Sequence, residues 1–162
     1  MKLVFREMVE NDLDYALECH CRVCHASNNF RGDRPAYDAF RARFVERGVW
    51  DESRTHILES MKDERTLATI VESEQGDRVG YCWVVFSDWY EEHKADISGV
   101  FVEEPFRRRG VAMGILSYIE KQAKERGANL LVSDTGVDNV VSQAMHEKYG
   151  FEPRWYHYHK WL

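Results

Sequence analysis

In the second half of the chain, a predicted strand, a basic turn and an amphipathic helix follow one another without a break. Residues 96–102 are rich in β-branched and aromatic side chains, and Pro105 follows them, so a strand is expected to end there. Three arginines, 107–109, then run into Gly110. Over residues 111–126 apolar side chains recur at four-residue steps with charged residues between them, which predicts an amphipathic helix. A strand that leads through a short turn into a helix favours an architecture of helices packed on a sheet.

The other segments of the chain show the same two kinds of pattern. Further strands are predicted at residues 2–7, 65–73, 79–88, 129–134 and 151–162. Further helices are predicted at residues 11–26 and 138–150, and residues 35–47 and 52–63 are predicted to form one or two more. The expected fold class is therefore α/β (α+β), with helices interrupting a mixed, mainly antiparallel sheet. The length of 162 residues suits a single domain that covers residues 1–162.

Positive charge is concentrated at the arginine turn, whereas the chain as a whole is acidic. The formal net charge is −6 and the pI is about 5.7. Nucleic-acid-binding proteins are usually basic overall or carry a broad basic face. A compact anionic group is therefore the expected ligand of the arginines, and no nucleic-acid partner is expected. A nucleic-acid-binding module that uses Arg107–Arg109 is the rival hypothesis.

The sequence also bears on the compartment in which the protein works. The first residues lack the apolar segment of a secretory signal, and no run approaches 18 apolar residues, so we expect no membrane partner. Four cysteines in a chain without a leader suggest reduced thiols and a cytoplasmic protein.

Three of the four cysteines lie close together within residues 19–25, where two histidines accompany them. A structural zinc site draws a second pair of ligands from elsewhere, but the only other cysteine is Cys82, inside a predicted strand. Cys21 and Cys24 continue the apolar stripe of a predicted helix, whereas Cys19 points elsewhere. We interpret the cluster as core and expect no metal.

The turn before the helix at 111–126 has the properties of a phosphate site. The first backbone N–H groups of a helix lack intrahelical partners and carry the positive end of the helix dipole. A phosphate at that position accepts several of these hydrogen bonds at once. Gly110 lets the ligand approach the backbone closely, and the arginines add charge and forked donors. The alternative is a solvated basic helix start.

Two motifs on these elements resemble the GCN5-related N-acetyltransferase (GNAT) family. The pyrophosphate loop of that family has the pattern Arg/Gln-x-x-Gly-x-Gly/Ala, and Arg107, Gly110 and Ala112 occupy its defined positions. A later helix of the family reads Asn-x6-Tyr-x3-Gly-Phe, and here Asn139, His146 and Gly150-Phe151 stand at these spacings. The motifs span about residues 96–151, and the predicted order of elements extends the resemblance over the chain.

The resemblance implies that acetyl-CoA is the cosubstrate and that an amine-bearing acceptor receives the acetyl group. Acetyl-CoA would lie in a gap between two splayed parallel strands, 96–102 and 129–134. The resemblance implies that the pantetheine arm is bound by the backbone of Val100, Phe101 and Val102. It implies that the pyrophosphate is held by Arg107, Arg108, Arg109, Gly110, Val111, Ala112 and Met113. It also implies that Asn139 reaches the cofactor from the later helix.

One histidine and one tyrosine are candidates for the acid that protonates the departing thiolate. The family's usual tyrosine position holds His146, and an imidazole is partly protonated near neutral pH. His146 either replaces the tyrosine as the acid or only packs against its surroundings while solvent supplies the proton. Tyr149, one turn further on, is the lower-ranked candidate.

A general base is also needed, because the amine must be neutral to attack. Asp134 ends the strand at 129–134 and is the candidate, although it can equally be a turn aspartate. Glu103, Glu104 and Asp96 are alternatives. The rival to an enzyme is a non-catalytic acyl-CoA sensor with the same fold, for which the missing tyrosine is the support.

Two aromatic segments are open to more than one interpretation. Residues 87–96 join two strands, and they either line an acceptor pocket or form an exposed hairpin tip. The predicted terminal strand at 151–162 has aromatic residues on both faces, which fits a sheet covered on each side or an edge that pairs in a homodimer.

Overall fold

The computed structural model describes residues 1–28, 30–155 and 157–160. Its elements follow the order β1 (Leu3–Glu7), a 3-10 turn (Glu10–Asp12), α1 (Leu13–Ser27), α2 (Tyr37–Glu46), α3 (Val49–Ser60), β2 (Thr66–Ser73), β3 (Arg78–Trp89), β4 (Glu92–Val102), a second 3-10 turn (Glu104–Phe106), α4 (Val111–Glu125), β5 (Leu130–Ser133) and α5 (Val140–Tyr149). The helices that were predicted from periodicity all form, with ends shifted by a few residues.

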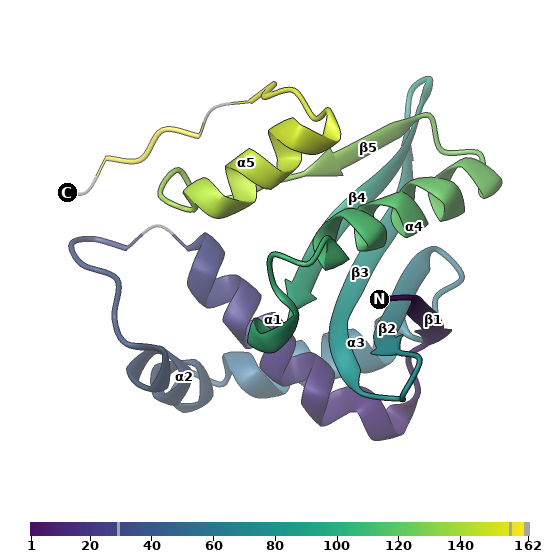
Figure 1. Ribbon diagram of the computed structural model, residues 1–162. Helices are drawn as coiled ribbons and strands as arrows, with labels where there is room; N and C mark the ends of the chain where they lie inside the picture. The colour runs from purple at the N-terminus through teal and green to yellow at the C-terminus, as the bar shows by residue number, and fades with distance from the viewer. Residues whose placement is uncertain (29, 156, 161–162) are drawn as a thin grey trace.

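One five-stranded sheet organises the molecule, in the order β1-β2-β3-β4-β5 (Figure 1). The first three pairings are antiparallel and β4 pairs with β5 in parallel. The predicted mixed, mainly antiparallel sheet is thus confirmed. The parallel pair arises because α4 carries the chain back to the start of β5, and a crossover of this kind requires a helix.

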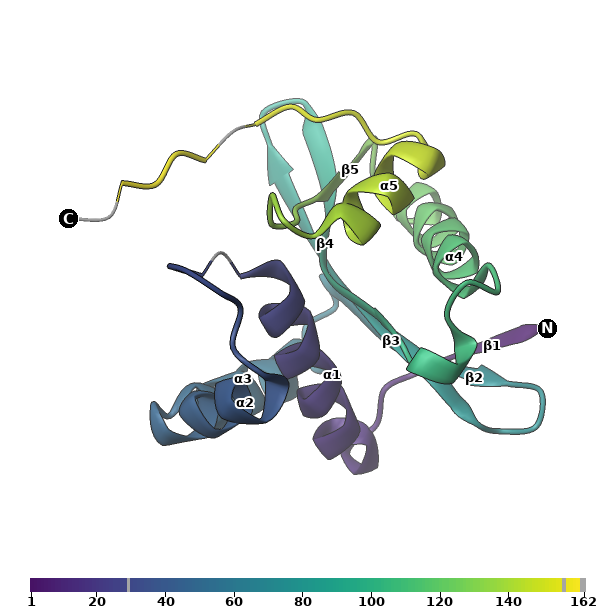
Figure 2. The ribbon, with the colours of Figure 1, turned by 60° about the vertical axis from the view of Figure 1, so that its left-hand side comes forward.

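Helices cover both faces of the sheet, and each face has its own apolar core (Figure 2). On one face α4 supplies a stripe of fully buried side chains, among them Ile115, Leu116 and Ile119. On the other face α1 and α3 pack on the sheet through residues such as Leu13, Leu17 and Ile57. The sheet therefore lies between the helices that follow the arginine turn and the N-terminal helices.

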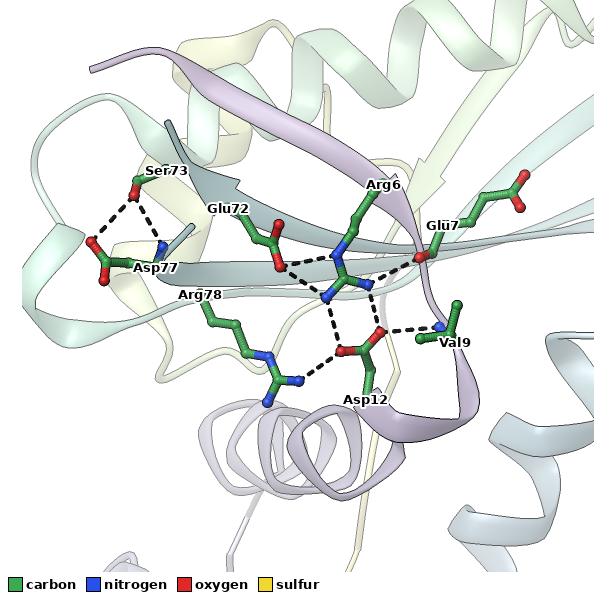
Figure 3. Close-up of polar contacts among 8 residues, drawn as sticks. All are labelled: Arg6, Glu7, Val9, Asp12, Glu72, Ser73, Asp77 and Arg78. Atoms are coloured by element: carbon green, nitrogen blue, oxygen red, sulfur yellow. Dashed lines mark hydrogen bonds and ion pairs between the residues drawn. The ribbon is translucent and has the colours of Figure 1, made fainter. Parts of the chain in front are cut away.

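A cluster of charged side chains joins the start of α1 to the sheet (Figure 3). The carboxylate of Asp12 is almost fully buried and accepts hydrogen bonds from Arg6 at 2.6 and 3.0 Å and from Arg78 at 2.7 Å. The backbone N–H of Val9 donates to the same carboxylate at 3.0 Å. Arg6 also pairs with Glu72 at 2.8 Å. The cluster links β1, β2 and β3 to the turn that begins α1.

The structure decides between the two interpretations of residues 87–96 and contradicts the strand predicted at the C-terminal end. β3 and β4 continue through most of residues 87–96, and Tyr90 lies 90% exposed in the turn, so the segment is an exposed hairpin tip. The predicted strand at 151–162 is wrong for residues 151–155 and 157–160, which form neither helix nor strand. The rest of that prediction, residues 156 and 161–162, lies outside the described residues. A strand needs a partner for its peptide groups, and the tail has none within the described chain.

The cysteines are core residues, as expected, but with one difference. Cys19, Cys21 and Cys82 are buried and Cys24 is half-buried, all as free thiols. Cys19 does not point away from the core, because it packs with Leu17 and Tyr81 between α1 and the sheet. The described residues contain no group of three potential metal ligands, and none of their helices is long and apolar enough to cross a membrane.

Candidate active site

The parallel strands β4 and β5 part after four residue pairs. Lys94–Ile97 pair with Leu130–Ser133, and β5 then ends whereas β4 continues to Val102. Over residues 98–102 one edge of β4 bonds β3, and the other edge has no strand beside it in the described chain. The predicted splayed pair is therefore confirmed. An irregularity in the β3–β4 register, between Trp83 and Val84, falls at the same level.

A tight turn connects the free end of β4 to α4. Arg108 and Gly110 both adopt left-handed backbone conformations, with φ of 58° and 80°. The left-handed region is unfavourable for arginine, so the turn holds Arg108 in a strained conformation next to the helix start. The Nε atom of Arg107 donates to the carbonyl oxygen of Val102 at 2.9 Å, which fixes the turn on the last residue of β4.

The start of α4 presents free donors to this turn. The first helical hydrogen bond runs from Gly114 to Gly110, and no side chain caps the helix. The N–H groups of Val111, Ala112 and Met113 consequently have no intrahelical acceptor. A Cβ built on Gly110 would meet nothing within 4 Å, so the backbone is open to a ligand.

The side chains around the turn divide between core and solvent. Val111 is buried in the α4 core, so it can offer a ligand only its backbone amide. Arg108 and Arg109 are exposed and form no ion pair with the described residues. A turn with free amides, two unpaired guanidinium groups and an open backbone fits a diphosphate, which takes hydrogen bonds and charge from several directions.

The loop before α5 is held in place by polar side chains. The Oδ1 atom of Asn139 accepts the backbone N–H of Ser142 at 3.3 Å and so caps the helix. The side-chain amide of Gln143 donates to the carbonyl oxygens of Gly136 and Val137, both at 2.9 Å. The capping role of Asn139 leaves its amide nitrogen as the part that can contact a cofactor.

His146 connects α5 to the end of β5. Its Nδ1 atom lies 2.8 Å from the carbonyl oxygen of Ser142, to which it must donate. Its Nε2 atom lies 2.8 Å from the hydroxyl of Ser133, the last residue of β5. The edge of the ring packs against Phe151, with centroids 5.1 Å apart. His146 is thus held at the point where β4 and β5 separate, and Ser133 is its partner there.

The structure does not bring Tyr149 to this point. Its hydroxyl donates to Glu120 of α4 at 2.6 Å, and burial together with that carboxylate raises the pKa of the phenol. The hydroxyl is therefore bonded to α4 on the other side of α5, and Tyr149 is no longer a candidate for the acid.

Two carboxylates, Asp96 and Asp134, flank the separation of the strands. Asp96 pairs in register with Val132 of β5, and Asp134 follows the last residue of that strand. Partial desolvation raises the pKa of Asp96, and the negative charge of Asp134 raises it further, against a smaller lowering by Lys94. A carboxylate whose pKa is raised is better matched to accept a proton near neutral pH.

Sequence reasoning missed some members of this site. Ser133 carries no motif, and only its place at the end of a predicted strand could have drawn attention to it. Asp96 was one of several alternatives, because its nearness to Asp134 depends on the β4–β5 register. The contact between Arg34 and Asp138, at 2.9 Å, joins residues 104 positions apart and has no sequence signal.

Residues 33–151 match the sequence profile described as the Acetyltransferase (GNAT) family. The chain belongs to this family. Among curated proteins, it is similar to the aminoglycoside N(6')-acetyltransferase type 1 of Salmonella typhimurium, with 36% identity over 56 residues. That match covers 35% of this chain, and the chain spans only 39% of the length of this relative.

Solved structures of the GNAT family share the whole fold. The aminoglycoside 6'-N-acetyltransferase AAC(6')-Ih of Acinetobacter baumannii superposes with a TM-score of 0.69 at 18% identity, over 99% of each chain. A predicted acetyltransferase of Clostridium acetobutylicum, solved with acetyl-CoA, superposes with a TM-score of 0.72 at 15% identity, over 98% of this chain and 96% of that one. At these identities the likeness shows the fold.

Proposed function

We propose that this GNAT protein is an acetyl-CoA-dependent N-acetyltransferase that acts on a primary amine. The observation that carries the proposal is the pairing of an open, uncapped helix start with a strand edge that has no partner. The first suits the diphosphate of coenzyme A, and the second suits its amide-containing pantetheine arm. Both lie on one continuous stretch of chain, from β4 through the arginine turn to α4.

The residues divide the binding of coenzyme A among them. The backbone of Val100, Phe101 and Val102 would bond the pantetheine arm along the free edge of β4. The amides of residues 111–113, with the guanidinium groups of Arg108 and Arg109, would hold the diphosphate. Acetyl-CoA supplies an activated thioester, from which the acetyl group passes to the amine.

The two carboxylates at the end of the strand pair would deprotonate the acceptor. The amine arrives as an ammonium ion, and only its neutral form attacks. Asp96 would be the base, because desolvation and the charge of Asp134 both raise its pKa. Asp134 would hold the ammonium before the proton leaves.

His146 would act through Ser133 on the departing thiolate. Because Nδ1 is occupied by the carbonyl oxygen of Ser142, only Nε2 is directed to Ser133. A protonated Nε2 can donate to the hydroxyl oxygen of Ser133, whose own proton can then pass onward. This arrangement supports the replacement of the usual tyrosine by a histidine–serine relay.

An aminoglycoside is our candidate acceptor class. The curated relative named above is an aminoglycoside N(6')-acetyltransferase, and the carboxylates of this chain suit a polycationic molecule. The alternative is an acyl-CoA sensor, which would have no need of a base. Release of free thiol from acetyl-CoA on adding an aminoglycoside would argue against the sensor.

Calorimetric titration with acetyl-CoA tests the binding site. Gly110→Glu puts a carboxylate at the open helix start and should weaken binding by more than about tenfold, because it repels the diphosphate and competes for its amides. Gly127→Glu is the matched control, since Gly127 has nearly the same φ, 82°, and is equally open at the other end of α4. Equal affinity of both variants would refute the loop assignment.

We also propose that the aromatic tail pairs two copies of the chain. Trp155 and Tyr158 are 87% and 91% exposed, and the tail leads away from the body (Figure 1). β5 is an edge strand, and beside it lies a groove of about 360 Å³ lined by Leu130, Leu131 and Phe151, among others. An exposed aromatic tail and an edge strand with an adjacent groove complement each other between two copies.

Light scattering during size exclusion tests this pairing. The intact chain should elute as a dimer, and the double substitution Trp155→Glu with Tyr158→Glu should give monomers. Tyr90→Glu, at the equally exposed hairpin tip, should leave the dimer intact. A monomeric intact chain at tens of micromolar would disprove the proposal.

A further inference from the structure

An ion pair joins the connection between α1 and α2 to the loop between β5 and α5. Arg34 lies in the connection between α1 and α2, and Asp138 lies in the loop between β5 and α5. Their side chains meet at 2.9 Å. Among the hydrogen bonds and ion pairs of the described residues, it alone joins the N-terminal helices to the chain after residue 130. Figures 1 and 2 both show these two segments side by side.

Arg34 is anchored to α1 independently of Asp138. One terminal nitrogen of its guanidinium donates to the carbonyl oxygens of His25 and Ala26, in the last turn of that helix. A cation is favoured there by the negative end of the helix dipole. The ring of His25 in turn donates to the carbonyl oxygen of Pro35 at 2.8 Å and packs against Phe40. The α1–α2 connection would therefore stay in place if Asp138 were released.

Asp138 is held in place by the start of α5, and its side chain remains accessible to solvent. It directly precedes Asn139, the capping residue of α5, and its side chain is 51% exposed. Asp138 lies four positions after Asp134, which places it within about 14 Å of that carboxylate along the chain. Because the ion pair is partly exposed to solvent, it is weak, and another cation can replace Arg34 on Asp138.

We propose that Asp138 is a specificity-determining residue that binds a second cationic group of the acceptor, and that Arg34 occupies this position until the acceptor displaces it. The inference rests on the proposed function, because it assumes that the reacting amine sits at Asp96 and Asp134. An acceptor with two ammonium groups can satisfy both carboxylate positions. A monoamine cannot open the ion pair, since it has no second cation to offer.

The two partners of the ion pair must then respond in opposite directions. Asp138→Asn removes the position for the second ammonium, so it should weaken the binding of a diamine by about three- to fivefold. Arg34→Gln removes the competing cation and keeps a side-chain donor for the α1 carbonyl oxygens. It should tighten diamine binding by about two- to fivefold. A contact with only a structural role predicts the same direction for both variants, because each breaks the same link.

Calorimetry on the intact chain, saturated with coenzyme A, measures these affinities. The probes are α,ω-diaminoalkanes of about four to eight carbons, chosen to cover the span between the carboxylates. The matching monoamines are the reference and should bind both variants like the unsubstituted protein. Shifts in the same direction, no shift in either variant, or no diamine binding to the unsubstituted protein would each overturn the inference.

Acetylation of the same amines, measured in parallel, separates this inference from the proposed function. Opposite shifts in diamine affinity without turnover of any amine would support the role of Asp138 and refute the acetyltransferase activity. Turnover accompanied by shifts in the same direction would support the activity and refute the role of Asp138.

Discussion

The buried carboxylate of Asp12 is expected to be a main contributor to the stability of this protein. Its side chain is only 2% exposed, and it accepts two hydrogen bonds from Arg6, one from Arg78 and one from the backbone of Val9 (Figure 3). Asp12→Asn keeps the shape of the side chain but removes its charge. The substitution removes the carboxylate that Arg78 pairs with and leaves Arg6 with Glu72 as its remaining ion-pair partner among the described residues.

The size of the effect follows from burial. Breaking a buried ion pair costs about 3–5 kcal/mol. Arg6 and Arg78 retain 34% and 42% of their side-chain exposure and can be rehydrated, which reduces the cost. Hydrogen bonds to charged groups contribute about 1.5–3 kcal/mol. We therefore expect the free energy of unfolding to fall by about 2–3 kcal/mol, which is the upper part of this range. For a domain of this size, that loss corresponds to a melting temperature lower by about 5–10 °C.

The same reasoning predicts how the effect depends on pH. The hydrogen bonds from Arg6 lower the pKa of Asp12 in the folded protein, and the contacts with Val9 and the charge of Arg78 add to this. Its stabilisation is therefore complete above the unfolded-state pKa of about 4, and it disappears as the pH falls through the lower folded-state pKa. The difference between Asp12→Asn and the original protein should be constant at neutral pH and shrink in strong acid.

Urea unfolding and thermal melts at pH 7 and below measure this difference. Asp14→Asn is the control, because Asp14 lies only two residues further on, in the first turn of α1, and pairs with Arg54, yet is 89% exposed. That substitution should change the stability by less than about 0.5 kcal/mol. If Asp12→Asn were no more destabilising than Asp14→Asn, or equally destabilising at every pH, the buried cluster would not have the role that its geometry indicates.

Three further predictions concern the region around β4. A Cβ at Gly99 would lie 2.6 Å from the Tyr81 hydroxyl, so Gly99→Ala should cost about 1–3 kcal/mol in urea unfolding, and Tyr81→Phe should restore most of it; no restoration would exclude this clash as the cause. Because its surroundings raise the pKa of Asp96, kcat/KM should fall as the pH drops through that pKa. Asp96→Asn should abolish this dependence and slow the reaction by about 10²- to 10⁴-fold, and an unchanged pH profile in the variant would show that Asp96 is not the base. His146→Phe should lower kcat in a thiol-release assay with little effect on acetyl-CoA affinity, and undiminished turnover would refute the proposed acid.

Much of the fold could be predicted because its signals are local. The helix predicted over residues 111–126 forms as Val111–Glu125, since an apolar stripe at helical spacing buries itself on any nearby sheet. The arginine turn was located by Gly110, whose left-handed backbone is rarely available to other residues. The tail at 151–162 shows the limit of this reasoning, because strand-forming residues form a strand only where another strand accepts their hydrogen bonds.

The candidate site was predictable to the extent that it lies on one stretch of chain. The free amides of α4 follow directly from the sequence, as does the helix that carries Asn139 and His146, because each depends on neighbouring residues. The hydrogen bond between His146 and Ser133 depends instead on how α5 packs against the end of β5. The raised pKa of Asp96 likewise depends on the register of two strands that are distant in sequence.

The sequence by itself determined the order of elements, the position of the basic turn and the chemical types available at the site. Periodicity, turn residues and helix ends act over a few positions, so they can be read without knowing the fold. Only the tertiary structure decided where the parallel strands part, that Tyr149 faces Glu120 and that Arg34 meets Asp138. Such contacts join segments far apart along the chain, and their energies depend on burial and distance, which local patterns do not contain.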